Sequence, residues 1–344
     1  MRGALLCLVS ASAFATLGVF GKLASDAGAG IATTLLVRFV LAGLVFAAAL
    51  ALTGGAAALL RLPRRVVLTG LALGAGGYSL QSGLYFAAIG RVDVSLVSLM
   101  LYTYPAFVTL AALALGRAKP SLRTGSALVV ASCGLVLVLV AAGTGAFDLT
   151  GALLALGASV TYTAYILVSD GIVGEVSPLA LSLLVLTGAS ATFAVAGLVS
   201  GSLDFRLPAE AWLWLVLIAL VSTVVAVSAF FAGLRRVGPS EAAILSTFEP
   251  PVTVALAFLV LGERLSPLQL AGGALVLAAV VVLQVPARRR RAASAASAAP
   301  AGPPSAGLPP TALPPVATSP PSSAAARPAP CAPSPTTRPA PSPP

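Results

Sequence analysis

The sequence predicts an all-α membrane protein with ten transmembrane helices, arranged as two five-helix repeats of inverted topology and followed by a disordered C-terminal tail. Three observations lead to this prediction: the composition, the number of long apolar segments and an internal repeat. The 344-residue chain is 58% hydrophobic and only 9% charged, and its mean hydropathy is +1.02. Soluble domains do not have this balance, so most of the chain is expected to lie in a lipid bilayer.

Ten apolar segments follow one another, separated by short breaks that carry glycine, proline and charge. Each holds about 20 residues, which as a helix crosses a hydrocarbon core of about 30 Å. The first segment could be a secretory signal peptide, but it continues past Phe20 to Lys22 and further spans follow, so a retained first span is predicted. The predicted spans are 3–24, 31–52, 66–89, 94–116, 122–141, 149–170, 178–200, 211–234, 240–262 and 267–286.

The basic residues between the spans predict the orientation. With the N-terminus inside, thirteen Arg or Lys residues fall on the inner side and three on the outer side. Positive charge accumulates in cytoplasmic loops, so both termini are expected to be cytoplasmic. The dominance of Arg over Lys, with abundant Ala and Gly, is typical of a GC-rich bacterial genome, which predicts a multi-pass protein of the bacterial inner (plasma) membrane.

The composition changes abruptly after the last span. Residues 287–344 begin with the basic cluster Arg288–Arg291 and hold 17 of the 27 prolines. So little apolar surface cannot form a core, and a disordered tail with polyproline II bias is predicted. The tail is either passive or a proline-rich ligand for a partner, and its arginines could bind anionic lipid.

The second half of the chain repeats the first at an offset of 145 residues. In this alignment Arg91 meets Arg236, Ser95 meets Ser240 and Pro105 meets Pro250. Five spans is an odd number, so the second copy enters the membrane inverted. Inverted repeats build many secondary transporters, whose substrate site lies near the midplane between the repeats. The predicted domains are therefore 1–141 and 149–286, followed by the tail at 287–344.

The residue types and motifs that the sequence lacks exclude several classes of function. Histidine is absent, and the three cysteines have no metal-ligand spacing, so no metal site and no histidine-based catalysis are expected. No phosphate-binding G-x-x-x-x-G-K-[ST] motif is present, which argues against ATP as the energy source. The net charge of +10 reflects membrane topology and does not indicate nucleic-acid binding. We expect no catalytic residue, no cofactor and no enzymatic activity.

The most informative residue is Glu249, which lies midway along the ninth predicted span, about nine residues from either end. A carboxylate at this depth costs at least a few kcal/mol and usually faces a cavity or a pathway. Pro250 and Pro251 follow it and interrupt the helix, as Pro105 does in the fourth span. Proline-interrupted spans at matching positions of two repeats indicate a binding site. Alternatively, Glu249 only bonds to a neighbouring helix and stabilises the break.

Further polar residues are predicted to line the same cavity, each with a structural alternative. Arg38 could bind an anionic substrate or Glu249, or could extend toward lipid headgroups. Gln81 and Tyr85 lie one turn apart and either contact substrate or link helices. Tyr102 and Tyr104 are two residues apart on a helix, so one is expected to line the cavity and the other to pack. The candidate binding residues are Glu249, Arg38, Gln81, Tyr85, Tyr104 and Tyr162.

The chain resembles the EamA-type transporters of the drug/metabolite transporter superfamily. The resemblance is strongest at Ser246-Thr247-Phe248-Glu249-Pro250-Pro251 and at Leu261-Gly262-Glu263-Arg264-Leu265, with further similarity at Leu101–Pro105 and Leu36–Phe39. It covers residues 3–286 and implies ten spans in two inverted five-helix repeats. This chain departs from the family pattern at Arg117, where an acidic residue is common, and near Ala15, where a Trp is common.

The predicted function is secondary active transport, and export is favoured. The expected substrates are small metabolites such as amino acids, related compounds or drugs, which reach a midplane site by alternating access. The energy is expected from a proton gradient or from the substrate gradient itself, the lipid bilayer is the medium, and a homodimer is one assembly that could form. The main alternative is a carrier of lipid or polyprenyl-linked substrates, and a membrane-embedded enzyme is less favoured because one central acid without histidine supplies no catalytic pair.

Overall fold

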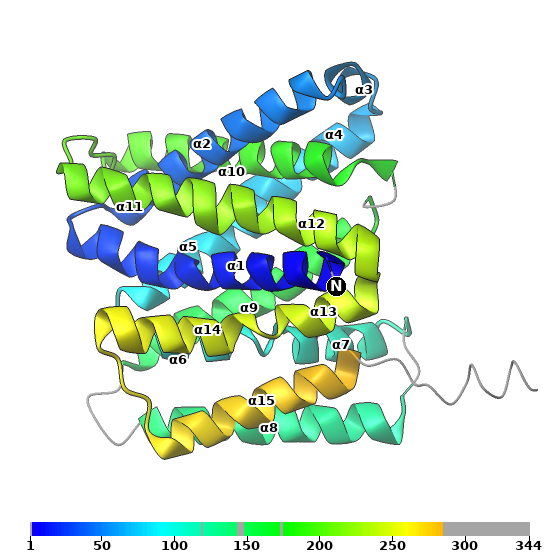
Figure 1. Cartoon of the computed structure of the whole chain (residues 1–344), viewed down its shortest axis with the longest axis vertical. Coiled ribbons are helices and arrows are strands. Elements are labelled where there is room, and N and C mark those ends of the chain that lie inside the picture. The colour runs from blue at the N-terminus through cyan, green and yellow to red at the C-terminus, as the bar shows by residue number, and fades with distance from the viewer. Residues whose placement is uncertain (1, 118–119, 143–147, 173–174, 285–344) are drawn as a thin grey trace, which may run out of the picture. The chain divides into compact units, whose positions relative to one another are not determined.

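The computed structural model describes residues 2–117, 120–142, 148–172 and 175–284, and within these ranges the chain is helical with no β-strand (Figure 1). The prediction of an all-α protein is therefore confirmed. The helices are α1 (Arg2–Asp26), α2 (Ile31–Leu52), α3 (Ala56–Leu60), α4 (Arg64–Ala72), η1 (Leu73–Tyr78), α5 (Ser79–Ile89), α6 (Val94–Leu101), α7 (Tyr104–Ala114), α8 (Leu122–Ala142), α9 (Leu149–Ser169), α10 (Pro178–Ser200), α11 (Ala209–Ala219), η3 (Leu220–Val225), α12 (Ala226–Val237), α13 (Pro239–Ser246), α14 (Glu249–Leu256), η4 (Ala257–Leu261) and α15 (Pro267–Gln284).

Nine helical stretches in the described ranges are long and apolar enough to cross a membrane. Their bounds agree with nine of the predicted spans to within a few residues. The remaining predicted span, 66–89, lies inside the helical stretch 64–89, which is not among the nine. Its glycines and its polar side chains make it less apolar than the others, because it supplies groups to the protein interior. The predicted disordered tail at 287–344 lies outside the described residues.

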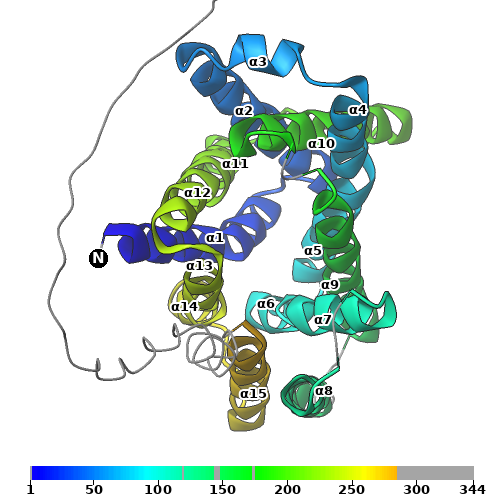
Figure 2. The ribbon, with the colours of Figure 1, turned by 90° about the vertical axis from the view of Figure 1, so that its right-hand side faces the viewer.

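Two helices lie at the centre of the arrangement and contact equivalent partners. Helix α1 packs against α11, α12 and α14, and α9 packs against α5, α6 and α7. Figure 2 shows α8 and α15 next to each other at the lower edge, where they pack together and both also contact α7. The central helices bring α6–α7 and α13–α14 toward each other, and these elements carry the predicted site.

Three helical stretches contain a π-helical segment, in which each turn is widened by one residue. In η1 the hydroxyl of Ser79 donates to the carbonyl of Gly74, and in η3 the hydroxyl of Thr223 donates to the carbonyl of Ile218. Both bonds reach five residues back. The widened turns place Tyr78 and Thr223 on the wall of the central cavity.

The backbone of the α4–η1 stretch lies directly against the backbone of α10. A Cβ atom added to Gly74 would lie 2.0 Å from the carbonyl oxygen of Val185, and one added to Gly188 would lie 2.1 Å from that of Leu71. Only glycine permits this contact, which is typical of small residues at membrane helix interfaces. The contact brings backbone against backbone and fixes η1 beside α10.

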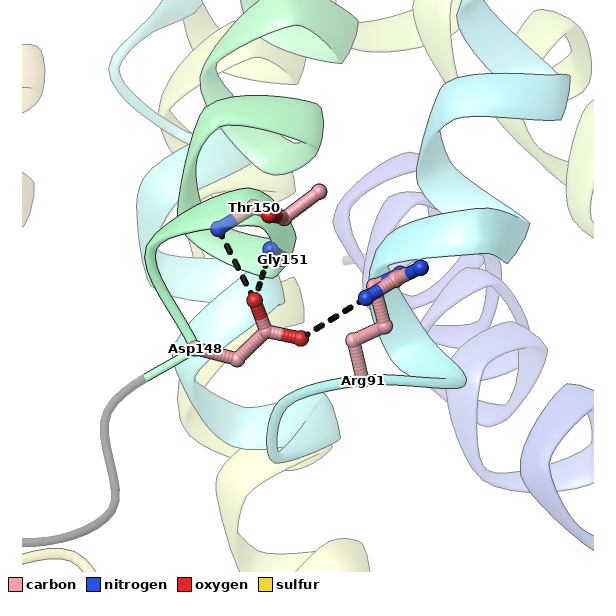
Figure 3. Close-up of polar contacts among 4 residues, drawn as sticks. All are labelled: Arg91, Asp148, Thr150 and Gly151. Atoms are coloured by element: carbon pink, nitrogen blue, oxygen red, sulfur yellow. Dashed lines mark hydrogen bonds and ion pairs between the residues drawn. The ribbon is translucent and has the colours of Figure 1, made fainter.

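Helix α9 begins at a charged N-cap, shown in Figure 3. Asp148 Oδ1 accepts hydrogen bonds from the backbone N–H groups of Thr150 (2.8 Å) and Gly151 (3.2 Å). Its Oδ2 accepts from Arg91 Nη1 at 3.1 Å. The Arg91 guanidinium and these backbone donors lower the pKa of Asp148. The cap therefore ties the start of α9 to the end of α5.

Candidate functional site

Two helical stretches break at equivalent positions. Helix α6 ends at Leu101 and α7 begins at Tyr104, while α13 ends at Ser246 and α14 begins at Glu249. Pro105 and Pro250 are the second residues of the helices that follow the breaks. Proline has no backbone N–H, so each proline leaves the carbonyl four residues earlier without its helical donor. The carbonyls affected in this way are those of Leu101 and Ser246.

Each of these two carbonyls accepts a hydrogen bond from a hydroxyl group outside its own helical stretch. Ser159 on α9 donates from Oγ to the carbonyl of Leu101 at 3.1 Å. Tyr102, which follows α6, donates from its hydroxyl to the carbonyl of Ser246 at 2.9 Å. Both breaks are thus satisfied from outside their own helix, as a buried backbone requires.

The breaks line two adjoining cavities of about 350 Å³ and 120 Å³. Residues Phe14, Tyr78, Tyr102, Tyr104, Tyr162 and Glu249 line both of them. All six candidate binding residues of the sequence analysis line the smaller cavity: Glu249, Arg38, Gln81, Tyr85, Tyr104 and Tyr162. Residues far apart in the sequence are therefore brought to one place.

Glu249 is the first residue of α14 and is partly buried. Its Oε2 accepts a hydrogen bond of 2.8 Å from the Tyr102 hydroxyl. Among the described residues no cation lies within ion-pairing distance of it. The carboxylate thus faces the cavity with one hydrogen-bond donor and no counter-ion.

Arg38 is almost completely buried, with 2% of its surface exposed. Its Nε donates to Thr223 Oγ1 at 3.0 Å and its Nη2 donates to the Tyr78 hydroxyl at 3.1 Å. The guanidinium lies 5.1 Å from the ring centroid of Phe39. These contacts fix it inside the protein, so it does not extend toward headgroups. The hypothetical Arg38–Glu249 ion pair is not formed, and no other carboxylate of the described chain pairs with Arg38.

Gln81 and Tyr85 are both buried on α5 and both line the smaller cavity. The Gln81 Oε1 accepts a weak hydrogen bond of 3.3 Å from Ser82 Oγ. The Tyr85 ring packs edge-on against Phe86 at 5.9 Å. The two side chains therefore add polar groups to the wall of the smaller cavity.

Aromatic rings form the rest of the wall. Tyr104 contacts Tyr162 edge-on at 4.8 Å, Tyr162 stacks on Tyr165 at 6.0 Å, and Tyr165 contacts Tyr78 at 5.7 Å. The expectation that only one of Tyr102 and Tyr104 lines the cavity is wrong, since both do. The reason is that the helix is interrupted between them, so helical spacing does not separate their directions.

Other lining residues were not predicted. Phe14, Phe46, Phe230 and Phe231 line the larger cavity, and Thr223 holds Arg38 in place. An aromatic residue in an apolar span has the same sequence signal whether it faces lipid or a cavity. The π-helical turn that directs Thr223 inward has no simple sequence signal either.

Glu263, which follows η4, has a structural role away from the cavity. Its carboxylate accepts from the backbone N–H groups of Val94 (2.7 Å) and Ser95 (2.9 Å) and from the Ser95 hydroxyl (2.7 Å). These are the first residues of α6, so Glu263 caps that helix from the other half of the chain. Burial, followed by the nearby Glu263 carboxylate, raises the pKa of Asp93 beside this cap.

Comparison with known proteins adds independent evidence. The model of the EamA-like transporter family matches residues 1–140 and again residues 149–285. An uncharacterized transporter of Archaeoglobus fulgidus is 28% identical over 199 residues, which cover 58% of this chain and 70% of that protein. The uncharacterized transporter YcbK of Bacillus subtilis is 28% identical over 211 residues, which cover 58% of this chain and 67% of that protein.

A solved crystal structure superposes with a TM-score of 0.60 and 20% sequence identity, covering 83% of this chain and 99% of its own. This likeness concerns the fold alone. The family match, by contrast, covers both halves of the chain, and the helices are long and apolar enough to span a bilayer. The chain therefore belongs to the EamA-like transporter family and is a multi-pass membrane transporter of small molecules.

Proposed function

We propose that this protein is a secondary active transporter that exports small zwitterionic metabolites, with amino acids and related compounds as the main class. The observation that carries the proposal is a cation and a carboxylate that line one cavity without pairing. Arg38 and Glu249 both line the smaller cavity, and neither has a counter-ion among the described residues. Unpaired charges in a membrane interior are costly, so their retention indicates a charged ligand.

A zwitterion would satisfy both charges together. Its carboxylate would bind the guanidinium of Arg38, whose Nη1 donates none of the hydrogen bonds described above. Its ammonium group would bind Glu249 and the faces of neighbouring tyrosine rings. The rest of the molecule would occupy the larger cavity, which is lined by aromatic and aliphatic side chains such as Tyr165, Phe230 and Phe231. Such a largely apolar wall with a few polar groups is typical of small-molecule sites.

Transport would proceed by alternating access of two inverted repeats, 1–141 and 149–286, with ten spans in all. The equivalent breaks at Pro105 and Pro250 support this architecture, as do the equivalent environments of α1 and α9. The continuous helical stretch 64–89 would provide the tenth span. One repeat would move relative to the other around the midplane site.

The charge distribution supports the proposed location, and the position of the larger cavity supports the proposed direction. We place both termini in the cytoplasm of a bacterial cell and the spans in its inner membrane. With this orientation, the larger cavity is lined by residues at the cytoplasmic ends of three spans, namely Pro178, Phe231 and Gln284. A cavity loaded from the cytoplasm supports export. A proton taken up by Glu249 is the proposed coupling ion, and a homodimer the proposed assembly.

The test is flux into proteoliposomes under an imposed pH gradient. Amino acids would be compared with the corresponding amines, which lack the carboxylate, and with the corresponding acids, which lack the ammonium group. We expect the zwitterion to be transported at least about tenfold faster than either analogue, since each analogue leaves one buried charge unpaired. Glu249→Gln should abolish gradient-driven flux, and Arg38→Gln should reduce selectivity for the carboxylate.

Three outcomes would contradict parts of the proposal. If the amine were transported as well as the amino acid, Arg38 would have no role in recognition and the site would be one for organic cations. If none of these compounds moved but a lipid or polyprenyl-linked substrate did, the chain would be a lipid carrier. Flux that survives Glu249→Gln would leave Glu249 with a structural role only.

A further inference from the structure

The Tyr102 hydroxyl has two acceptors and only one hydrogen. It lies 2.9 Å from the carbonyl oxygen of Ser246 and 2.8 Å from Glu249 Oε2. A phenol can donate one hydrogen bond at a time, although its oxygen can also accept. The two short contacts can therefore both be full two-centre hydrogen bonds only if Glu249 supplies the second proton.

The two protonation states of Glu249 consequently differ in their hydrogen bonds. When Glu249 carries a proton, it donates to the Tyr102 oxygen, and Tyr102 donates to the carbonyl of Ser246. When Glu249 is ionised, the carboxylate is the stronger acceptor and takes the Tyr102 hydrogen. The carbonyl of Ser246 then loses its donor, and Pro250 cannot replace it.

We infer that Tyr102 is a positioning residue that links the protonation of Glu249 to the backbone of α13. This inference rests on the proposed proton-coupled function, which it deepens. The bond crosses from the end of α6 to the end of α13, so it joins two half-helices from different halves of the chain. Ala243 and Ser246 of α13 line the larger cavity. Loss of the bond on ionisation would therefore free this wall of the cavity to move.

The other groups around Glu249 do not supply a competing titration. The other ionisable groups that line its two cavities are the phenols of Tyr78, Tyr85, Tyr102, Tyr104, Tyr162 and Tyr165 and the guanidinium of Arg38. None of these is a carboxyl group, so Glu249 is the one carboxylic acid among the described residues that line these cavities. Helix α1, which packs against α14, adds only Phe14 and Leu17 to this wall. Glu249 is thus the group that changes charge.

The equivalent break offers a matched control. The Leu101 carbonyl also accepts from a hydroxyl, that of Ser159. Among the described residues no carboxylate bonds to Ser159, and the other partner of its hydroxyl is the Thr103 hydroxyl at 3.0 Å. Ser159→Ala therefore removes an equivalent bond between a hydroxyl and a proline-exposed carbonyl without touching a titratable group.

The experiment measures the reactivity of a cysteine in the cavity wall, without substrate or flux. Ala243→Cys would be introduced into the full chain after replacement of Cys7, Cys133 and Cys331 by alanine, and its rate of reaction with a maleimide followed in detergent from about pH 5 to about pH 9. The same cysteine in Glu249→Gln supplies the reference for the pH dependence of the thiol itself. As the pH rises, we expect the maleimide reaction rate, relative to the rate in Glu249→Gln, to increase about threefold or more. This is the size that loss of one hydrogen bond gives.

Tyr102→Phe should remove this Glu249-dependent change, whereas Ser159→Ala should retain it. Pro250→Ala restores an N–H donor for the Ser246 carbonyl, so it should also flatten the pH dependence even if Tyr102→Phe folds poorly. The inference is overturned if the Glu249-dependent change is absent from the starting protein, persists in Tyr102→Phe or disappears in Ser159→Ala. Because no transport is measured, failure here is distinct from failure of the proposed zwitterion flux.

Discussion

The two broken stretches, α6–α7 and α13–α14, share a backbone but differ in chemistry. Both are interrupted for two residues, both have proline as the second residue of the following helix, and both have the exposed carbonyl covered by a hydroxyl. At the first residue after the break, however, the first stretch has Tyr104 and the second has Glu249. The comparison indicates that both halves of the chain share the helix break, whereas only the second half has a charged residue at it.

The stretches also differ where their helices end and begin. Gly116 and Gly262 both adopt a left-handed conformation after their stretch, with φ of +67° and +72°. The next residue is Arg117 in the first copy and Glu263 in the second, and Glu263 caps α6. In the first copy the cationic side chain cannot accept hydrogen bonds, so it cannot cap a helix N-terminus in this way. Within the described residues, Glu263 therefore makes a capping contact that Arg117 cannot make.

The largest difference between the two stretches is expected when the missing backbone N–H groups are restored in one stretch at a time. Pro250→Ala with Pro251→Ala returns two N–H groups beside Glu249 and should shift its carboxylate. A displacement of about 1 Å can cost on the order of 100-fold, so we expect at least a tenfold loss of flux in proteoliposomes. Pro105→Ala is the matched control and should cost less, because no charge lies at that break. Equal losses would show that the two breaks contribute in the same way.

The next test removes the Glu263 carboxylate that caps α6. Glu263→Ala leaves the N–H groups of Val94 and Ser95 without their acceptor, and the loss of such a cap costs about 1–2 kcal/mol. Thermal unfolding in detergent should register this as a lower midpoint. Arg117→Ala, at the equivalent exposed position, should change stability by less than about 0.5 kcal/mol. A similar midpoint for both variants would exclude a special role for the Glu263 contact.

The smallest effect concerns the Asp148 cap. Its pKa is lowered, so its ionised form stabilises the folded state. That contribution is complete above the ordinary value of about 3.9 and is lost as the pH falls through the lowered pKa. Asp148→Asn should therefore lower the unfolding midpoint slightly near neutral pH, and the difference from wild type should shrink below about pH 3. A difference that is constant with pH would mean that the charge and the Arg91 pair contribute nothing.

The helices could be predicted well from the sequence because each span has a long apolar run bounded by charge, glycine or proline. The segment around Gln81 is the instructive case, since its polar residues make it less apolar while it remains helical from Arg64 to Ile89. The three π-helical segments could not be predicted. Two of them, η1 and η3, carry hydroxyl bonds that reach five residues back, which have no simple sequence signal.

For the site, the sequence indicated which residues are polar and deep, but not how they pair. Arg38 and Glu249 could be identified because charge within an apolar span is rare. Their separation could not, since Arg38 bonds instead to Thr223 and Tyr78 from two other spans. The direction of Tyr102 was also inaccessible, because its helix ends at Leu101. The position of the break within a few residues decides where that ring lies.

The Glu263 cap has a consequence for biosynthesis. The ribosome makes Val94 and Ser95 about half the chain before it makes Glu263, 169 and 168 residues later. During that interval the first residues of α6 lack the acceptor that the finished protein provides. The first half of the chain is thus made without this cap. The N–H groups of Val94 and Ser95 gain their acceptor only after Glu263 has been synthesised. Two halves made as separate polypeptides would each expose an unmatched partner of this contact, and their assembly would depend on finding each other.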